Sequence, residues 1–133
     1  MQELPDWPDG TVAVLSTAGA APHAIPVSLV LRAGPCELLV GLAPRRESLA
    51  RLRDDPSCAV TILAAGDQAF TAHGRSTGFE EAGGLIAVRI EVDRLADHNR
   101  PTYEITDGVR WHWTDDDDRG RDAESRAALR RLL

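Results

Sequence analysis

Two adjacent arginines give the first indication of a binding site. Arg45 and Arg46 follow Pro44, a residue suited to the first position of a helix, and Leu49 and Leu52 continue a helical pattern. Positive charge in the first turn of a helix is unfavourable by about 0.3–1 kcal/mol per residue. Free N–H groups at a helix start bind anions and guanidinium groups pair with phosphate, so a bound phosphate would remove this conflict. The alternative interpretation is a pair of exposed surface arginines.

A second candidate is the pair Gly74 and Arg75, which interrupts a strand-like segment. A glycine inside a strand often marks the close approach of a ligand or of another backbone. Arg75 would then be placed to reach an anion or a carboxylate. A bulge or a barrel corner explains the same glycine equally well.

Several kinds of chemistry lack the residues that they need. All 15 basic residues are arginine, which excludes a Schiff-base lysine. Cys36 and Cys58 lie far apart in apolar surroundings, and Cys58 is expected to be a small buried hydrophobic residue. The histidines show no metal-binding spacing, so no metal site is expected. They are His23, His73, His98 and His112. Glycine-rich motifs for dinucleotides or for a P-loop are also absent.

Length, net charge and hydropathy limit the number of domains and the kinds of partner that the chain can have. The 133 residues suit a single domain over 1–133, with a core at about 11–95 and a C-terminal strand and helix at about 103–133. A net charge of −6 argues against nucleic acid as a partner. No apolar run is long enough to span a membrane, and the start lacks the basic and apolar regions of a signal peptide, so we expect a cytoplasmic protein without a membrane partner.

The hydrophobic pattern predicts mainly β structure. Short alternating segments are separated by turn residues, with one helix in the middle of the chain and one at its end. Strands are expected at 11–17, 23–32, 37–42, 58–63, 68–76, 85–95 and 109–113, and helices at 44–55 and 121–133.

Pro26 lacks an N–H group, so its strand needs an edge, a bulge or a ligand at that point. Ala65-Gly66-Asp67 predicts a tight hairpin. The four aspartates 115–118 are interpreted as a solvated linker. This pattern is typical of a small antiparallel barrel with a helix against it.

The order of these segments resembles a known family. A strand ending at Thr17 is followed by Pro22-His23-Ala24-Ile25-Pro26-Val27-Ser28, and then by an apolar strand reaching Gly41. A basic helix closing in Leu52-Arg53-Asp54-Asp55-Pro56 precedes His73-Gly74-Arg75-Ser76. Over about residues 11–95 this is similar to the pyridoxamine 5′-phosphate oxidase-like flavin split-barrel family, which includes FMN proteins and F420-dependent reductases. The resemblance implies a six-stranded antiparallel split β-barrel of the FMN-binding type, and a homodimer with flavin in the groove between subunits.

The resemblance also implies a set of cofactor-binding residues. The strand beside the isoalloxazine ring would supply Pro26, Val27 and Ser28. The segment that holds the phosphate would supply Gly41, Leu42, Arg45, Arg46, Ser48 and Arg51. The Gly-Arg pair of the family would be Gly74 and Arg75.

Two positions depart from the family pattern. Ser48 and Arg51 stand where the helix of the family usually carries a lysine and an asparagine. Either Arg45, Arg46 and Arg51 hold the phosphate instead, or the chain binds flavin weakly or not at all. Trp111 and Trp113 lie outside the family motifs; packing in the core or at an interface is the favoured role, and contact with a partner's flavin is the other.

The function expected from these residues and the resemblance is that of a bacterial flavin-dependent oxidoreductase acting on a small organic substrate. The cofactor performs hydride transfer, and the protein binds and orients it. FMN is favoured over F420, because the carboxylate tail of F420 would meet the acidic residues Asp54, Asp55, Glu80 and Glu81. No residue is assigned as catalytic. A flavin-binding carrier or sensor dimer is the alternative from another class. A nucleic-acid-binding barrel fits poorly with 5% aromatic residues and the acidic charge.

Overall fold

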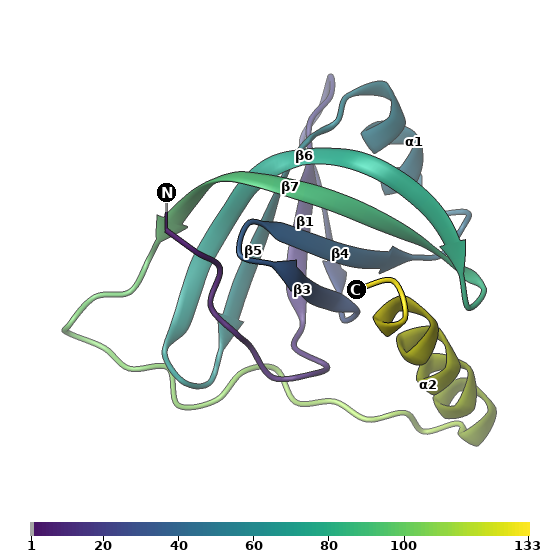
Figure 1. Cartoon of the computed structure of the whole chain (residues 1–133). Helices are drawn as coiled ribbons and strands as arrows, with labels where there is room; N and C mark the ends of the chain where they lie inside the picture. The colour runs from purple at the N-terminus through teal and green to yellow at the C-terminus, as the bar shows by residue number, and fades with distance from the viewer. Residues whose placement is uncertain (1) are drawn as a thin grey trace.

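The structure is a computed structural model that describes residues 2–133, and one curled antiparallel sheet dominates it (Figure 1). The strands are β1 (Ala13–Thr17), β2 (His23–Val27), β3 (Val30–Gly34), β4 (Glu37–Leu42), β5 (Ser57–Ala64), β6 (Gln68–Ala82) and β7 (Leu85–Asp97). The helices are α1 (Glu47–Asp54) and α2 (Asp116–Arg130). The strand order β2-β1-β5-β6-β7-β4-β3 makes β2 and β3 the two edges.

The two edge strands are consecutive in the chain, and this closes the fold. Only Ser28 and Leu29 lie between the end of β2 and the start of β3. Val27 and Val30 are three residue steps apart, which span at most about 11 Å, so the sheet must curl until its opposite edges approach each other. The expected split-barrel class is therefore confirmed, with the barrel left unclosed between β2 and β3.

The strand expected over 23–32 is divided at this corner into β2 and β3, so the sheet has seven strands where the resemblance implied six, and residues 109–113 are not among them. Pro26 lies in the edge strand β2. That position removes the need for an N–H group on one side, as the sequence predicted.

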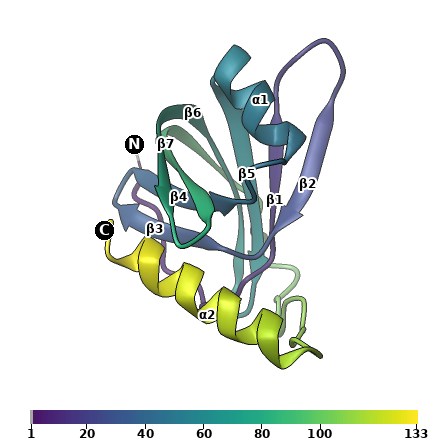
Figure 2. The same ribbon diagram turned by 90° about the vertical axis from the view of Figure 1, so that its right-hand side faces the viewer.

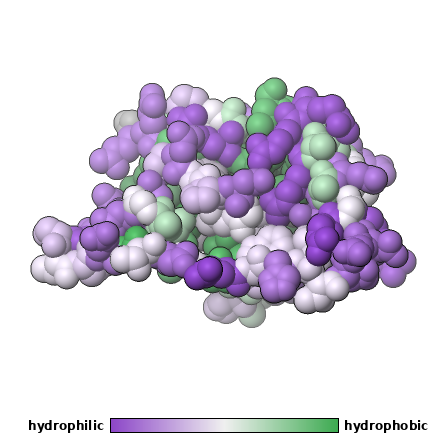
Figure 3. Space-filling model, turned by 90° about the horizontal axis from the view of Figure 1, so that it is seen from below, coloured by the Kyte–Doolittle hydropathy of each residue, from purple (hydrophilic) through white to green (hydrophobic). Residues whose placement is uncertain are grey.

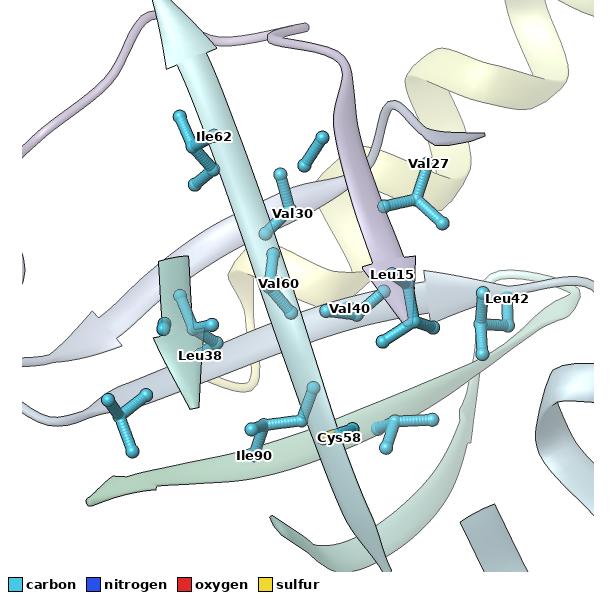
Figure 4. Close-up of a cluster of buried hydrophobic side chains, with 14 of the residues drawn as sticks. Leu15, Val27, Val30, Leu38, Val40, Leu42, Cys58, Val60, Ile62 and Ile90 are labelled. Atoms are coloured by element: carbon cyan, nitrogen blue, oxygen red, sulfur yellow. The ribbon is translucent and has the colours of Figure 1, made fainter. Parts of the chain in front are cut away.

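The core fills the inside of the curled sheet (Figure 4). Leu15, Leu38, Val60 and Ile90 are fully buried and come from four different strands. Burial of each such side chain stabilises the fold by about 1.5–3 kcal/mol. The alternation that predicted these strands is therefore the alternation between this core and the outer surface.

The long β6–β7 hairpin explains Gly74 without a ligand. The pairing shifts register between His73 and Gly74, and a Cβ atom at position 74 would lie 2.0 Å from the carbonyl oxygen of Glu91. The glycine is required because two backbones approach closely at a bulge. The β5–β6 turn is the predicted hairpin, with positive φ at Gly66 and Asp67.

Helix α1 is shorter than predicted. It begins at Glu47, with Arg46 as its N-cap residue, while Ala43 to Arg46 form a turn in which the Arg46 N–H donates to the Ala43 carbonyl at 3.0 Å. Arg45 and Arg46 therefore precede the first turn instead of lying within it. Glu47 occupies that turn, where its negative charge suits the helix dipole.

The C-terminal region differs most from the sequence prediction. Residues 109–113 form no strand; they belong to an extended strap, residues 98–115. At its start the His98 N–H donates to the Ala69 carbonyl of β6 at 2.8 Å, and further along it is held by side-chain contacts such as Trp111 Nε1 to the Gly10 carbonyl at 2.8 Å. The aspartates 115–118 are not a linker. Asp115 caps α2 by accepting from the Asp117 N–H, and the next three lie in the first turn, a favourable position for acidic groups.

Helix α2 lies across the outer side of β3 and β4, on the opposite side of the sheet from α1 (Figure 2). Leu129 of α2 is fully buried against Leu29, Leu31, Leu39 and Ala87. Seen from below, where the strap and α2 lie, the surface is largely hydrophilic (Figure 3). The helix therefore covers an apolar face that the strands alone would expose.

Replacing Leu129 by alanine should lower the free energy of unfolding by about 2–5 kcal/mol, because it leaves a cavity beneath α2. Urea denaturation monitored by circular dichroism measures this. Leu133→Ala, which changes a side chain that is 55% exposed, is the matched control and should have little effect. Equal stability of the two variants would mean that α2 is not packed as described.

Candidate functional site

Strand β2 and the segment that joins β4 to α1 run alongside each other. We call residues 41–48 the connecting segment. At one end, the Gly41 N–H donates to the Leu29 carbonyl at 2.9 Å, just beyond β2. At the other end, Ser48 Oγ lies 3.2 Å from Nε2 of His23, the first residue of β2. These two contacts bring Pro26, Val27 and Ser28 close to the phosphate-binding segment expected from the sequence.

The predicted site residues on β2 and the connecting segment differ in how much of each side chain is exposed. Pro26 is exposed and Ser28 is half-buried, whereas Val27 and Leu42 point into the core and offer only their backbones. Gly41 is required by packing, because a Cβ atom there would lie 2.7 Å from Leu29 Cδ2. The surface available to a ligand therefore comes from Pro26, Ser28 and the backbone of the connecting segment.

Arg45 and Arg46 are suited to an anion. Both are exposed, and within residues 2–133 neither forms an ion pair or a side-chain hydrogen bond. Helix α1 has no side-chain cap, so the N–H groups of its first turn are also without a side-chain acceptor. Two guanidinium groups and a helix start in one place are a phosphate-binding arrangement.

Ser48 and Arg51 make internal contacts instead. Ser48 is 1% exposed, and its hydroxyl meets His23. Arg51 donates from Nε to Glu47 at 2.8 Å and from Nη1 to the Ala21 carbonyl at 3.0 Å. The hydrogen bond from Arg51, followed by the charge of a protonated His23, lowers the pKa of Glu47. These side chains join α1 to β2 and to the β1–β2 turn, and their hydrogen-bonding groups are already engaged within the chain.

Glu47, His23 and Ser48 form a chain that resembles an acyl-transfer triad. His23 Nδ1 lies 3.1 Å from Glu47 Oε2, and its Nε2 faces the Ser48 hydroxyl. A nucleophile must reach a substrate carbonyl, however, and Ser48 is buried. The cluster is a structural link between β2 and α1.

Gly74 and Arg75 lie away from the connecting segment. Their neighbour Ser76 donates to the Leu52 carbonyl at 3.3 Å, near the C-terminal end of α1. Arg75 is exposed and pairs with Ser57 at the start of β5. Within residues 2–133, this pair lies beside the C-terminal part of α1, where Leu52 follows Arg51, and no hydrogen bond or ion pair joins Arg75 to 26–28 or 41–48.

Sequence reasoning missed one feature beside the site. It is Arg126 of α2, whose Nη2 donates to the Ser28 carbonyl at 2.8 Å. No local pattern reveals such a contact, because the two residues are distant in the chain. The homodimer expected from the sequence requires an open strand face, and the outer surface of β2, β1 and β5 is a candidate for it.

We call this surface the uncharged face. Val14 pairs with Pro26 on one side and with Thr61 on the other. Val14 is 41% exposed and Leu63 is 54% exposed. The uncharged face consists of Val14, Ser16, Ala24, Pro26, Ala59, Thr61 and Leu63. A contiguous surface without charge is unusual for a chain in which 27% of residues are charged, and it indicates an interaction surface.

Among residues 2–133, the cysteines and the remaining acidic groups form no second reactive or metal-binding site. Burial, with a smaller effect from Asp93, raises the pKa of the Cys58 thiol to about 12, so this residue behaves as the expected buried hydrophobic residue. In the part of the chain that the structure describes, no three His, Cys, Asp or Glu side chains come together as a metal site requires. Among residues 2–133, no helix has the length and apolar character needed to cross a bilayer.

A cavity of about 520 Å³ lies between the tip of the β6–β7 hairpin and α2. Gly83, Trp113 and Ser125 contribute to its lining, and none of the predicted site residues does. The candidate site is instead an open strip on the surface of a single chain.

Comparison with known proteins shows the fold. No protein-family model matches the sequence, and no curated protein matches it. Solved structures do match. The flavin reductase component BorF of a bacterial two-component tryptophan halogenase has a TM-score of 0.60 and 16% identity, covering 68% of this chain and 81% of that one.

Two further solved structures extend this likeness. The NADH:FAD oxidoreductase SgcE6 of Streptomyces globisporus C-1027, solved in complex with NAD and FAD fragments, has a TM-score of 0.59 and 16% identity, covering 80% of this chain and 87% of that one. A putative pyridoxamine 5′-phosphate oxidase from Listeria innocua has a TM-score of 0.56 and 16% identity, covering 68% and 90%. The chain therefore has the split-barrel fold that flavin reductases and pyridoxamine 5′-phosphate oxidase-like proteins share, as its motifs predicted.

Proposed function

We propose that the protein is a flavin-binding oxidoreductase that works as a homodimer with FMN. The observation that carries this proposal is the strip where β2 runs beside the connecting segment, with two unengaged arginines at the start of α1. The fold supports it, because the similar structures described above include flavin reductases.

The phosphate of the flavin would lie at Arg45 and Arg46. Each guanidinium group is exposed and has no acceptor within residues 2–133, so it can turn toward an anion without breaking an existing contact. Ser48 and Arg51 are already engaged with His23 and the Ala21 carbonyl, which favours Arg45 and Arg46 for this role. The phosphate site is therefore shifted toward the residues just before α1.

The flavin ring would lie along Pro26 and Ser28. Pro26 offers an apolar surface without an N–H group, which suits a flat aromatic ring, and Ser28 offers a hydroxyl. When bound, FMN supplies the capacity for hydride transfer, while the chain binds and orients it. No side chain of 26–28 or 41–46 exchanges protons near neutral pH.

A second copy of the chain would complete the site. Pro26 belongs both to the strip and to the uncharged face, so a partner seated on that face would also cover the flavin ring. Gly74 and Arg75, which are distant from the strip in one chain, would contribute across this interface.

The lack of an acid or a base among residues 26–28 and 41–46, where the flavin would lie, also favours a second candidate, a flavin carrier or sensor without turnover. Anaerobic mixing of the flavin-loaded protein with NADH or NADPH, followed by reoxidation, distinguishes the two. Repeated reduction and reoxidation supports the oxidoreductase, and a flavin that stays oxidised supports the carrier.

Replacing Arg45 and Arg46 together by glutamine should weaken FMN binding by several kcal/mol, taking about 1.5–3 kcal/mol for each charged hydrogen bond. Stability should change little, because the helix start loses positive charge. Fluorescence titration with FMN measures this. The matched control is Arg119→Gln with Arg121→Gln, which removes the same charge from α2. Parent-like affinity in the Arg45/Arg46 variant would contradict the phosphate site.

Light scattering at micromolar concentration should give twice the chain mass of 14.4 kDa. Leu63→Asp should produce a monomer, because it places a charge in the uncharged face. Leu133→Asp changes a side chain of matching exposure at the end of the chain and should leave the dimer intact. A monomeric parent would remove both the dimer and its shared site.

FMN should bind more tightly than F420 at matched ionic strength. The phosphate contact is common to both, but the F420 tail carries carboxylates, which the acidic groups Asp54 and Asp55 beyond Arg51 would repel. Parallel titrations of the apoprotein with FMN, FAD and F420 test this. Binding of F420 that is tenfold tighter, or about 1.4 kcal/mol, would reverse the assignment; tighter binding of FAD would change the flavin but keep the site.

A further inference from the structure

We propose that Arg126 of α2 is a positioning residue for the strip where β2 runs beside the connecting segment. It fixes the backbone of Ser28 through a hydrogen bond to the Ser28 carbonyl. The C-terminal region would then contribute to the cofactor site through the backbone of Ser28. This inference rests on the proposed function, since it assigns a role toward the same strip.

Arg126 joins three segments that are distant in the chain. Its Nη2 donates to the Ser28 carbonyl at 2.8 Å, its Nε donates to Asp122 Oδ2 at 2.8 Å, and its Nη1 lies 3.3 Å from Asp9 Oδ1. The side chain is only 11% exposed and lies against the ring of Trp111, 5.9 Å from its centroid. A guanidinium group that is shielded in this way, with each nitrogen engaged, is held in one orientation.

The Ser28 carbonyl needs such a partner because of its place in the sheet. Strand β2 is an edge, it ends at Val27, and Ser28 lies in the two-residue corner before β3. No strand pairs with this residue, so its carbonyl depends on a donor from outside the sheet. Arg126 supplies that donor and fixes where the end of β2 lies.

The same face of α2 reaches the other side of the strip. Leu129 is three residues after Arg126 and therefore lies on the same side of the helix. Its Cδ2 atom lies 3.1 Å from where a Cβ of Gly41 would be, at the start of the connecting segment. Helix α2 thus contacts the corner after β2 through Arg126 and the connecting segment through Leu129, so a shift of α2 would reach both sides of the strip.

Hydrogen exchange tests, without flavin, whether Arg126 stabilises the backbone of the corner at Ser28 and Leu29. Arg126→Lys keeps the positive charge near Asp9 and Asp122 but loses the planar fork. We expect faster exchange at the Gly41 N–H, which bonds the Leu29 carbonyl at this corner. The control is Arg130→Gln, which removes another arginine of α2 that pairs with Asp9 but does not contact Ser28.

Flavin affinity then separates positioning from simple stability. With both variants shown to be folded by circular dichroism at the assay temperature, Arg126→Lys should raise the Kd for FMN about three- to tenfold, the effect of one hydrogen bond. It should also change the visible absorption bands of the bound flavin. Arg130→Gln should leave Kd and spectrum as in the parent. If Arg126→Lys fails to fold, Asp122→Asn, which removes one anchor of the guanidinium group, replaces it with the same expectation.

The outcomes are distinct. A higher Kd for Arg126→Lys alone, with faster exchange at Gly41, supports the inference. An unchanged Kd in a variant with a lower melting temperature overturns it, because Arg126 is then only structural. A parent that binds no flavin overturns the proposed function itself, and the inference with it.

Discussion

The short connection between β2 and β3 is the constraint on which the rest of the structure depends. Because two opposite edges of the sheet are joined through Ser28 and Leu29 alone, the sheet has to curl, and its inner face becomes a core. The same connection leaves an unpaired corner beside the connecting segment. The barrel, its split and the candidate site therefore have one geometric origin.

Electrostatics then distinguishes arginines that look alike in the sequence. Arg51 lies on α1 within reach of Glu47 and the Ala21 carbonyl, so its donors are used inside the fold. Arg45 and Arg46 precede the helix and have no such neighbours. A cation without a partner beside an uncapped helix start retains its capacity for an anion. The position of each arginine relative to the start of α1 decides which role it has.

The C-terminal strap and helix connect the core to the site. Leu129 is buried against β3, β4 and β7, which fixes α2 by apolar contact, while Arg126 uses that fixed position to reach the Ser28 carbonyl. Apolar packing supplies the docking energy, and the hydrogen bonds determine the orientation. Helix α2 covers this side of the sheet, whereas the uncharged face of β2, β1 and β5 stays open to solvent.

The sequence by itself determined the β class, most strands and the β5–β6 hairpin, since alternation and turn residues act locally. The missing N–H of Pro26 restricted its strand to an edge, a bulge or a ligand, and the strand order decided for the edge. The sequence also identified the segments on both sides of the strip. It misplaced the start of α1 and read 109–113 as a strand, and it could not show which residues grouped with the site are already engaged within the chain, as Ser48 and Arg51 are. Only the tertiary structure decided these points. Pairing partners, burial and long-range acceptors such as the Ser28 carbonyl are set by residues far apart in the chain, which no local pattern records.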